Sequence, residues 1–328
     1  MDDRSLTIDA LPNSCWSSLD WSALAGQTLF LTGATGFVGR WILATISKMN
    51  SVSETPLYVR ALTRKTQSFK RPWITWVPGD IRNFTDDVPV DLVLHAALPS
   101  TSTPPGGELE LFDIACLGVE HVMKHAAFSG SRRTMVLSSG AVYGDASLPV
   151  SEFVSLGPVP PTDTYARAKR EVEAVARSFT RTNHDILVAR LFTCFGEGYR
   201  SHNHLAHVSL LRQARAGGPL MLKGDGASIR SYLAGEDLGL WLLALLSRRG
   251  CDTVNVGSDT VMSIRDLALL VAQCAGLDQT KISFAGESAG ARNYFVPDIT
   301  KARNYYGLEP WTPVKTVVER LLRAQTML

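Results

Sequence analysis

The stretch TLFLTGATGFVG, residues 28–39, joins an apolar strand to a glycine-rich turn and then to a helix. The apolar run Thr28–Thr32 predicts a buried strand, and the periodicity of Val38–Met49 predicts the helix. Glycines between them permit a tight turn and let a phosphate approach the backbone N–H groups at the positive end of the helix. An ordinary chain reversal is the alternative. The placement between strand and helix favours dinucleotide binding, by the following residues: Gly33, Thr35, Gly36, Phe37, Val38 and Gly39.

Segments with strand and helix patterns alternate after this turn. The predicted strands are Leu57–Leu62, Ile74–Val77, Val90–His95, Thr134–Ser138 and Ile186–Leu191. The predicted helices between them are Leu111–Phe128 and Tyr165–Arg181. Such alternation predicts an α/β fold with a doubly wound parallel sheet, covered by helices on both faces.

The pattern changes beyond residue 192, where glycine and proline turns separate shorter elements. Helices are expected at Asp237–Arg249, at Ile264–Ala275 with Ser263 as its N-cap, and at Lys315–Gln325. We therefore expect three parts in the chain. Residues 1–25 form a lead-in that Trp16 and Trp21 pack on the body. Residues 26–192 form a dinucleotide-binding domain. Residues 193–328 form a smaller, mainly substrate-binding lobe, from which residues around 232–258 return to the dinucleotide-binding domain.

Composition and charge restrict the kinds of partner. The 328 residues carry a net charge of +2, which gives no electrostatic case for nucleic acid or an acidic membrane as the main partner. The five cysteines are odd in number, scattered and without a Cys-x-x-Cys pair, which argues against disulfides and zinc and for a reducing compartment. The first residues lack a secretory signal, and the apolar run Leu238–Leu246 is too short to span a membrane. We expect a cytoplasmic protein without a metal.

The end of the second predicted strand bears on the choice of cofactor. The usual fingerprint places a carboxylate there to hold ribose hydroxyls. This chain instead has Thr63-Arg64-Lys65. Because a guanidinium pairs with a 2′-phosphate, NADP(H) is favoured over NAD(H), which remains possible. The alternative is that Arg64 and Lys65 are solvated loop charges.

Tyr165 and Lys169 are four residues apart, on one face of a predicted helix. A nearby ammonium is expected to lower the pKa of the Tyr165 phenol, which then exchanges a proton with a carbonyl oxygen as hydride arrives or leaves. Ser138 and Ser139 end the fifth predicted strand, at the edge of the sheet where ligands gather, and a hydroxyl there can bond the same oxygen. A surface tyrosine beside a solvated lysine is the alternative.

Together these motifs resemble the extended short-chain dehydrogenase/reductases, the epimerase/dehydratase group, over roughly residues 26–325. The motifs follow the family's order: GATGFVG at 33–39, Gly79-Asp80-Ile81, His95-Ala96-Ala97, SSGAVYG at 138–144, Tyr165-x-x-x-Lys169, Arg190-Leu191-Phe192, GDGASIRSYL at 224–233, and Arg292 followed by Pro297-Asp298 and Lys301-Ala302.

The resemblance implies a Rossmann fold and a role for each matching residue. It implies Ser139, Tyr165 and Lys169 as the catalytic trio, with Lys169 also holding the nicotinamide ribose. Further cofactor contacts are implied at Asp80 and Ile81 near the adenine, and at Ala96, Ala97, Leu191 and Phe192. A nucleotide-linked sugar is the implied substrate, its diphosphate held by Arg230 and Arg292, while Thr193 replaces the family's asparagine at a substrate-phosphate position.

Departures from the family pattern narrow the reaction. The acid and base of the family's 4,6-dehydratases are replaced by Gly140 and Ala141. The Thr-Ser-Glu pattern of the family's decarboxylases is also absent, because no carboxylate residue lies in Leu137–Val142. Reduction of a 4-keto (4-keto-6-deoxy) sugar is favoured, with 4-epimerisation on tightly bound NAD(P) as the alternative. Two other hypotheses are a non-catalytic NADP-binding regulatory protein and a dehydrogenase of non-nucleotide ketones. Relatives commonly dimerise through helices matching Leu111–Phe128 and Tyr165–Arg181, so a homodimer is expected.

Two groups of residues suggest other chemistry. His202, His204 and His207 lie close together, but their spacing does not place all three on one helical face and no carboxylate accompanies them. We expect a loop or cofactor contact there. Cys194 lies next to the expected cofactor site without any signature of a nucleophile, which favours a small packed thiol.

Overall fold

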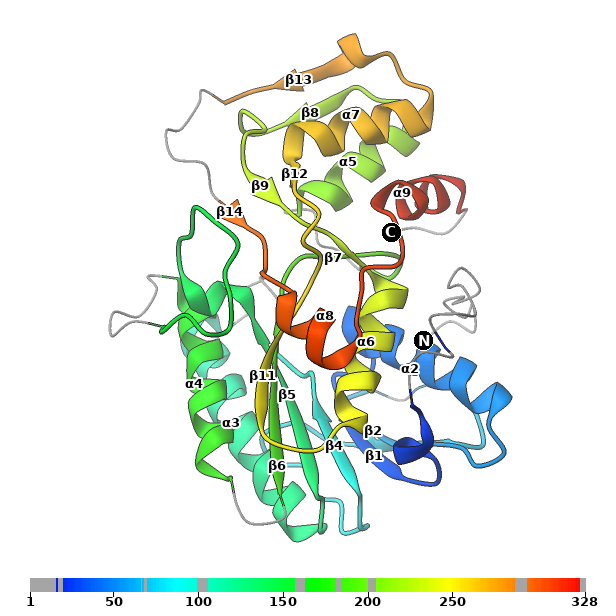
Figure 1. Ribbon diagram of the computed structural model, residues 1–328, viewed down its shortest axis with the longest axis vertical. Coiled ribbons are helices and arrows are strands. Elements are labelled where there is room, and N and C mark those ends of the chain that lie inside the picture. The colour runs from blue at the N-terminus through cyan, green and yellow to red at the C-terminus, as the bar shows by residue number, and fades with distance from the viewer. Residues whose placement is uncertain are drawn as a thin grey trace.

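The computed structural model describes residue 16 and residues 20–65, 67, 70–98, 106–156, 163–180, 184–199, 205–286 and 294–324. Its centre is a seven-stranded sheet in the order β11-β6-β5-β4-β1-β2-β3, and every neighbouring pair is parallel (Figure 1). The strands are β1 (Thr28–Thr32), β2 (Tyr58–Thr63), β3 (Ile74–Pro78), β4 (Leu92–His95), β5 (Arg133–Ser139), β6 (Asp185–Leu191) and β11 (Asp252–Val256).

Helices cover both faces of this sheet, so the predicted doubly wound fold is confirmed. One face carries α2 (Phe37–Val52) and α6 (Gly235–Ser247), and the other carries α3 (Gly107–Phe128) and α4 (Thr164–Ser178). The alternation of β1 shows the division, because Leu29 and Leu31 pack in the core with α2 and α6 whereas Phe30 packs in a separate core with α3.

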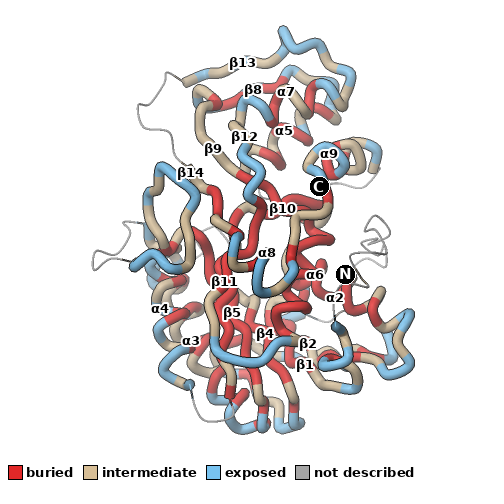
Figure 2. The backbone as a smooth tube through the Cα atoms, in the orientation of Figure 1, coloured by how far each residue is buried: buried red, intermediate tan, exposed pale blue. Residues whose placement is uncertain are grey.

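The helix α6 is buried along almost its whole length (Figure 2), as its apolar sequence predicts. It lies so close to α2 that a Cβ at Gly235 would fall 2.1 Å from the Trp41 ring, and a Cβ at Gly239 would fall 2.2 Å from Thr45 Oγ1. Glycine is therefore the residue that both contacts require. Within the described ranges, no helix has the length and apolar character to cross a bilayer.

A second, smaller group of elements stands above the carboxyl edge of the sheet (Figure 1). Its helices α5 (Ala206–Arg215), α7 (Ile264–Ala275) and α9 (Val314–Arg323) enclose a core of their own. Ser263 caps α7 in a capping box with Asp266, so that predicted N-cap is confirmed. Short sheets frame the helices: β8 (Leu220–Leu222) with β13 (Ile282–Phe284), β9 (Ile229–Arg230) between β12 (Met262–Ser263) and β14 (Tyr294–Phe295), and β7 (Cys194–Phe195) with β10 (Leu233–Ala234).

The predicted boundaries shift by a few residues. Helix α3 begins at Gly107 instead of Leu111, and α4 ends at Ser178, before the predicted Arg181. The helix α8 (Thr300–Tyr306) and the two-residue strands were not predicted, because tertiary pairing and not periodicity defines such short elements. In the lead-in, Trp16 and Trp21 pack on the main core, as expected. The division of the chain at residue 192 stays a prediction.

A buried carboxyl joins α6 to the segment before α9. Asp237 is fully buried and accepts hydrogen bonds of 2.9 Å from the backbone N–H and from the hydroxyl of Thr312. Burial raises the pKa of Asp237 from 3.8 to about 7, although the bonds from Thr312 oppose the shift. Because the pKa is raised on folding, the protonated form favours folding at low pH, and this contribution is lost as the pH rises from about 4 through 7.

The substitution Asp237→Asn removes the charge and leaves an amide that bonds both groups of Thr312. We expect the variant to melt roughly 5 °C or more above the wild type at pH 8, with a clearly smaller difference at pH 5, where only the first part of the contribution has been lost. Thermal unfolding of both proteins at the two pH values measures this. An equal change in Tm at both pH values would contradict the assignment.

Candidate active site

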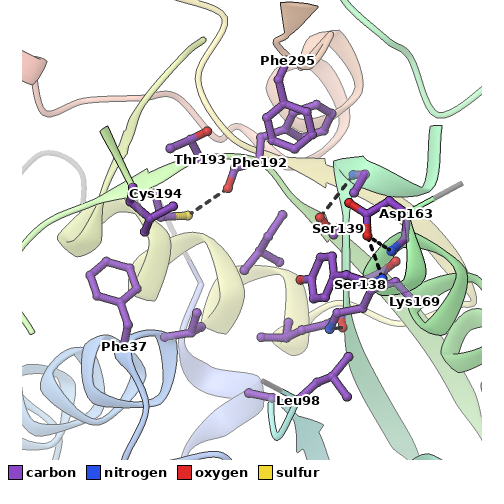
Figure 3. A pocket seen from close by; sticks show the side chains of 18 of the residues that line it. Phe37, Leu98, Ser138, Ser139, Asp163, Lys169, Phe192, Thr193, Cys194 and Phe295 are labelled. Carbon is purple, nitrogen blue, oxygen red and sulfur yellow. Dashed lines mark hydrogen bonds between the residues drawn. The ribbon is translucent and has the colours of Figure 1, made fainter. Parts of the chain in front are cut away.

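A cavity of about 760 Å³ lies between the carboxyl edge of the large sheet and the smaller group of elements (Figure 3). Its wall combines the glycine turn after β1 with the ends of β4, β5 and β6 and the first turns of α4. Residues of α5, β9 and β14 close the opposite side. Parallel strands bring their carboxyl ends to one edge, so chain segments far apart in sequence meet in this cavity.

The glycine turn has almost no room for side chains. Gly33 has a φ of +71°, and a Cβ there would lie 2.6 Å from the backbone of Ala96. A Cβ at Gly39 would lie 2.2 Å from the Gly33 carbonyl oxygen. Gly36 caps α2 without a side-chain hydrogen bond, and Gly36–Gly39 line the cavity, so the first N–H groups of α2 are available to a ligand. This open cradle fits the diphosphate of a dinucleotide.

The structure brings the predicted trio together on one wall. Ser139 ends β5, and its hydroxyl accepts a hydrogen bond of 3.2 Å from the Ala141 N–H. Tyr165 and Lys169 project from α4, whose N-cap Asp163 accepts bonds from two backbone N–H groups. Lys169 Nζ donates to the Leu137 carbonyl oxygen at 2.7 Å and lies 5.8 Å from the centroid of the Tyr165 ring. Their catalytic roles stay predictions.

The electrostatics differ from the expectation that Lys169 lowers the pKa of Tyr165. Burial raises the pKa of Tyr165 to about 12, and a hydrogen bond with Ser139 only partly opposes this. Burial also lowers the pKa of Lys169 to about 7, against the opposing charge of Glu173. The expectation is wrong because burial dominates the pKa of each group, and neither group is among the causes that shift the pKa of the other. At neutral pH Tyr165 is a protonated phenol.

Other predicted residues also line the cavity. They are Phe37, Val38, Ala96, Leu191, Phe192, Thr193 and Arg230, in addition to Gly33, Gly36 and Gly39. Thr32 anchors the neighbouring strand end, since its hydroxyl accepts bonds from the N–H groups of Ala96 and Ala97. Arg230 forms a bond with the Ile229 carbonyl oxygen and lies 6.0 Å from the Phe295 ring centroid. Arg292 lies outside the described residues.

A second group of predicted residues lies beyond the cavity wall. Thr35, Ala97, Thr63, Arg64, Asp80 and Ile81 belong to it. Asp80 is held by Arg82, whose Nε and Nη2 donate to it at 2.7 and 3.1 Å, and the bond to Arg82 lowers the pKa of Asp80. The Ile81 side chain is buried and packs where Gly118 leaves space on α3. Any adenine contact at Ile81 therefore involves its backbone.

Several cavity residues were not predicted. Tyr199 stacks on Phe37 with ring centroids 4.0 Å apart and donates to the Cys194 carbonyl oxygen at 2.8 Å. Asp145, Asp163 and Phe295 also line the wall. Asp163 could have been predicted, because an Asp just before a helical segment is an N-cap signature. Tyr199, Asp145 and Phe295 reach the cavity only through long-range packing, which the sequence does not show.

The groups that suggested other chemistry lie as follows. His207 lies on α5 and not in the expected loop, is buried among the rings of Phe195, Tyr199 and Tyr232, and lines the cavity; the alternative, a cofactor contact, stays a prediction. His202 and His204 lie outside the described residues. Among the residues that the structure describes, no group of three or more His, Cys, Asp or Glu could hold a metal. Cys194 is a buried thiol, and burial raises its pKa to about 12, as expected of a packed side chain.

Position 140 has no space for an acid. A Cβ at Gly140 would lie 2.6 Å from the ring of Phe192, which itself packs against Phe295 with centroids 4.7 Å apart. A carboxylate side chain at this position would have to displace both aromatic rings. The neighbouring Ala141 lines the cavity with a methyl group alone.

Comparisons with known proteins agree with this architecture. A model described as the NAD dependent epimerase/dehydratase family matches residues 29–257. The chain is 26% identical over 300 residues to UDP-glucuronic acid decarboxylase 1 of Xenopus tropicalis, covering 88% of this chain and 70% of that protein. It is 27% identical over 266 residues to GDP-6-deoxy-D-mannose reductase of Pseudomonas aeruginosa, covering 77% and 81%. The solved structure of MoeE5 with UDP-glucose and NAD superposes with a TM-score of 0.76 at 23% identity, over 90% of this chain and 97% of that one, which supports the fold.

The crowded turn makes a specific prediction. Gly39→Ala places its methyl group against the Gly33 carbonyl oxygen, so we expect a loss of about 1–3 kcal/mol in the free energy of unfolding and loss of dinucleotide binding. Gly224→Ala is the matched control, because a Cβ there meets nothing within 4 Å. Denaturant unfolding and titration with NADPH and NADH measure both effects. Equal behaviour of the two variants would refute this account of the turn.

Proposed function

Because the chain belongs to the NAD dependent epimerase/dehydratase family, we propose that it is an NADP(H)-dependent reductase of a nucleotide-linked 4-keto sugar. The names of its relatives support a nucleotide sugar as substrate, since they refer to UDP-glucuronic acid and to GDP-6-deoxy-D-mannose. A cavity of about 760 Å³ has the volume of a site for a cofactor and a substrate of this size.

The observation that carries the reductase proposal is the placement of Ser139, Tyr165 and Lys169 together on one wall of the cavity. Reduction of a ketone needs a proton donor at the carbonyl oxygen, and a phenol with a pKa of about 12 is protonated at neutral pH. Ser139 bonds to Tyr165 and would share the same substrate oxygen. Lys169 lies one helical turn below, where its ammonium group would hold the nicotinamide ribose.

The surroundings of the trio disfavour the other reactions of relatives. Elimination of water needs an acid and a base, but positions 140 and 141 carry neither, and Phe192 leaves no space for a side chain at Gly140. The carboxylates that line the described cavity are Asp145 and Asp163. Asp163 already accepts the bonds that cap α4, so it is engaged in holding the helix.

Two parts of the cavity suit the two ligands. When bound, the nicotinamide cofactor supplies the hydride for the substrate carbonyl carbon. The N–H groups of α2 at Phe37–Gly39 would hold its diphosphate, and Leu191 and Phe192 would line its nicotinamide end. Arg230 would bind the diphosphate of the sugar nucleotide with Arg292 and Thr193, because a guanidinium presents forked donors to phosphate oxygens.

The proposal extends to the wider biology of the chain. We propose a cytoplasmic homodimer formed through α3 and α4. Leu109 and Leu117 on α3 are exposed and would be covered by such a dimer. Retention of Ser139, Tyr165 and Lys169 in one cavity favours catalysis over a purely regulatory role.

The proposed reaction is tested with nucleotide-linked 4-keto-6-deoxysugars and NADPH. We expect stoichiometric consumption of NADPH and at least a 100-fold lower kcat in Tyr165→Phe, which lacks the proton donor. Absorbance of the reduced cofactor measures both. Interconversion of nucleotide sugars without net consumption of NADPH would replace the reductase with the alternative 4-epimerase.

The preference for NADP(H) depends on Arg64. This residue is exposed at the end of β2, where the NAD-binding members of the fold place a carboxylate. We expect Arg64→Ala to raise the KM for NADPH about 10-fold or more, through the loss of charge-assisted bonds to the 2′-phosphate, and to leave the KM for NADH nearly unchanged. Steady-state kinetics with both cofactors measures this. A parallel change in both KM values, or a wild type that prefers NADH, would refute the preference.

A further inference from the structure

A buried carboxylate lies one helical turn beyond Lys169 on α4. The Glu173 side chain is 4% exposed. Its Oε1 accepts hydrogen bonds from Ser138 Oγ at 2.5 Å and from Arg190 Nε at 2.8 Å, and its Oε2 accepts one from Arg190 Nη2 at 2.7 Å. Burial alone would raise the pKa of Glu173, but the bonds and charge of Arg190, the bond from Ser138 and the charge of Arg177, which donates to Oε2 at 3.3 Å, together lower it. The carboxylate is therefore ionised.

The hydroxyl that Glu173 holds belongs to the strand end of the active site. Ser138 stands between Leu137, whose carbonyl oxygen receives the Lys169 ammonium, and Ser139, the predicted catalytic hydroxyl. A displacement of Ser138 would move both neighbours, because they share its backbone. The carboxylate thus fixes this segment of β5 against the helix that carries Tyr165 and Lys169.

Arg190, the partner of this carboxylate on β6, is held firmly in turn. Its guanidinium lies 4.7 Å from the centroid of the Tyr143 ring. The Tyr143 hydroxyl donates to Asn255 Oδ1 at 2.8 Å, and Asn255 Nδ2 donates to the carbonyl oxygens of Val150 and Asp298 at 2.7 and 3.2 Å. The ion pair is anchored at several points, as a rigid support of an active site requires.

We propose that Glu173 is a positioning residue for the trio, which holds the Ser138–Ser139 strand end against α4 and keeps a negative charge beside the Lys169 ammonium. This inference rests on the proposed function for its catalytic consequence. Glu173 contacts neither Tyr165 nor the cavity, so it acts through Ser138 and through its charge.

The charge matters because Lys169 is buried. Burial lowers the pKa of Lys169 to about 7, and Glu173 opposes the shift. Other groups face Lys169 from three elements: Tyr165 on α4, His95 on β4, and Ser139 with the Leu137 carbonyl on β5. Tyr165 is a neutral phenol, and burial lowers the pKa of His95 to about 3, so His95 is neutral too. Loss of the Glu173 charge therefore leaves the ammonium without the partner that opposes burial.

The first test measures Lys169 directly and needs no substrate. Acetic anhydride acetylates the neutral amine, and mass spectrometry of the peptide with Lys169 gives the extent at each pH. We expect Glu173→Gln to shift the midpoint of this reaction down by about one pH unit. The control is Glu171→Gln, an exposed glutamate on the same helix, which should keep the wild-type midpoint. An unshifted midpoint in folded Glu173→Gln would overturn the electrostatic role.

The second test measures catalysis. We expect kcat for ketosugar reduction to fall about 10-fold or more in Glu173→Gln, with the KM values for NADPH and for the ketosugar nearly unchanged. The basic limb of the pH profile should move to lower pH by the same amount as the midpoint of Lys169 acetylation. Glu173→Asp, which keeps the charge on a shorter arm, should restore the basic limb. A lower melting temperature with wild-type kcat and pH profile would show a merely structural role and overturn the proposal.

Ser138→Ala covers the case in which Glu173→Gln does not fold, because it leaves the ion pair with Arg190 in place. It should lower kcat and keep the wild-type midpoint of Lys169 acetylation; an unchanged kcat would overturn the positioning of the strand end.

The proposed role of Glu173 and the proposed reductase activity can fail separately. A shifted midpoint in a protein that reduces no ketosugar supports the role of Glu173 and refutes the reductase, whereas reduction with an unshifted midpoint does the reverse.

Discussion

The close packing of α2 against glycine residues, where no side chain fits, is the constraint on which the rest of the molecule depends. At its N-terminus, Gly39 lies against Gly33 with no space for a Cβ. Two residues further on, Trp41 fills the space left by Gly235 of α6, and a Cβ at Gly196 would also approach its ring to 3.0 Å. One helix therefore positions the cradle of N–H groups, the central helix of the core and the start of the chain's path into the smaller lobe. Helices pack this closely only where glycine replaces a larger side chain.

Burial governs the chemistry of the cavity more than the pairing of charges does. Tyr165 and Lys169 are close enough to interact, yet desolvation moves both pKa values toward the neutral forms. The charge that opposes the effect of burial on Lys169 comes from outside the cavity, where Glu173 and Arg190 stay ionised because each hydrogen-bonds the other. A buried ion pair of this kind contributes little net stability, but it fixes geometry, and the charge of Glu173 raises the pKa of Lys169 against burial.

The sequence predicts best the features that depend on local periodicity and caps. The strand Thr28–Thr32 and the helix Ile264–Ala275 have the predicted bounds, because an apolar run and a capping box define them locally. The glycine turn and the Tyr165–Lys169 pair were found from spacing alone. Tyr199 and Phe295 were not found, since only the fold brings them to the cavity wall. The pKa of Tyr165 was predicted in the wrong direction because sequence spacing reveals a neighbouring charge but not the loss of water.

Under the proposed function, the two directions of hydride transfer make different demands on Tyr165. Epimerisation begins by oxidising the sugar, for which Tyr165 must first lose its proton and act as a base. A phenol with a pKa of about 12 resists this loss at neutral pH, and a Lys169 with a pKa of about 7 supplies only part of the positive charge that would ease it. Reduction begins from the phenol as it stands, and the proton moves to an oxygen on which negative charge is developing. Under the proposed function, the resting Tyr165 is therefore a proton donor, and Glu173 limits how far burial removes the positive charge from Lys169.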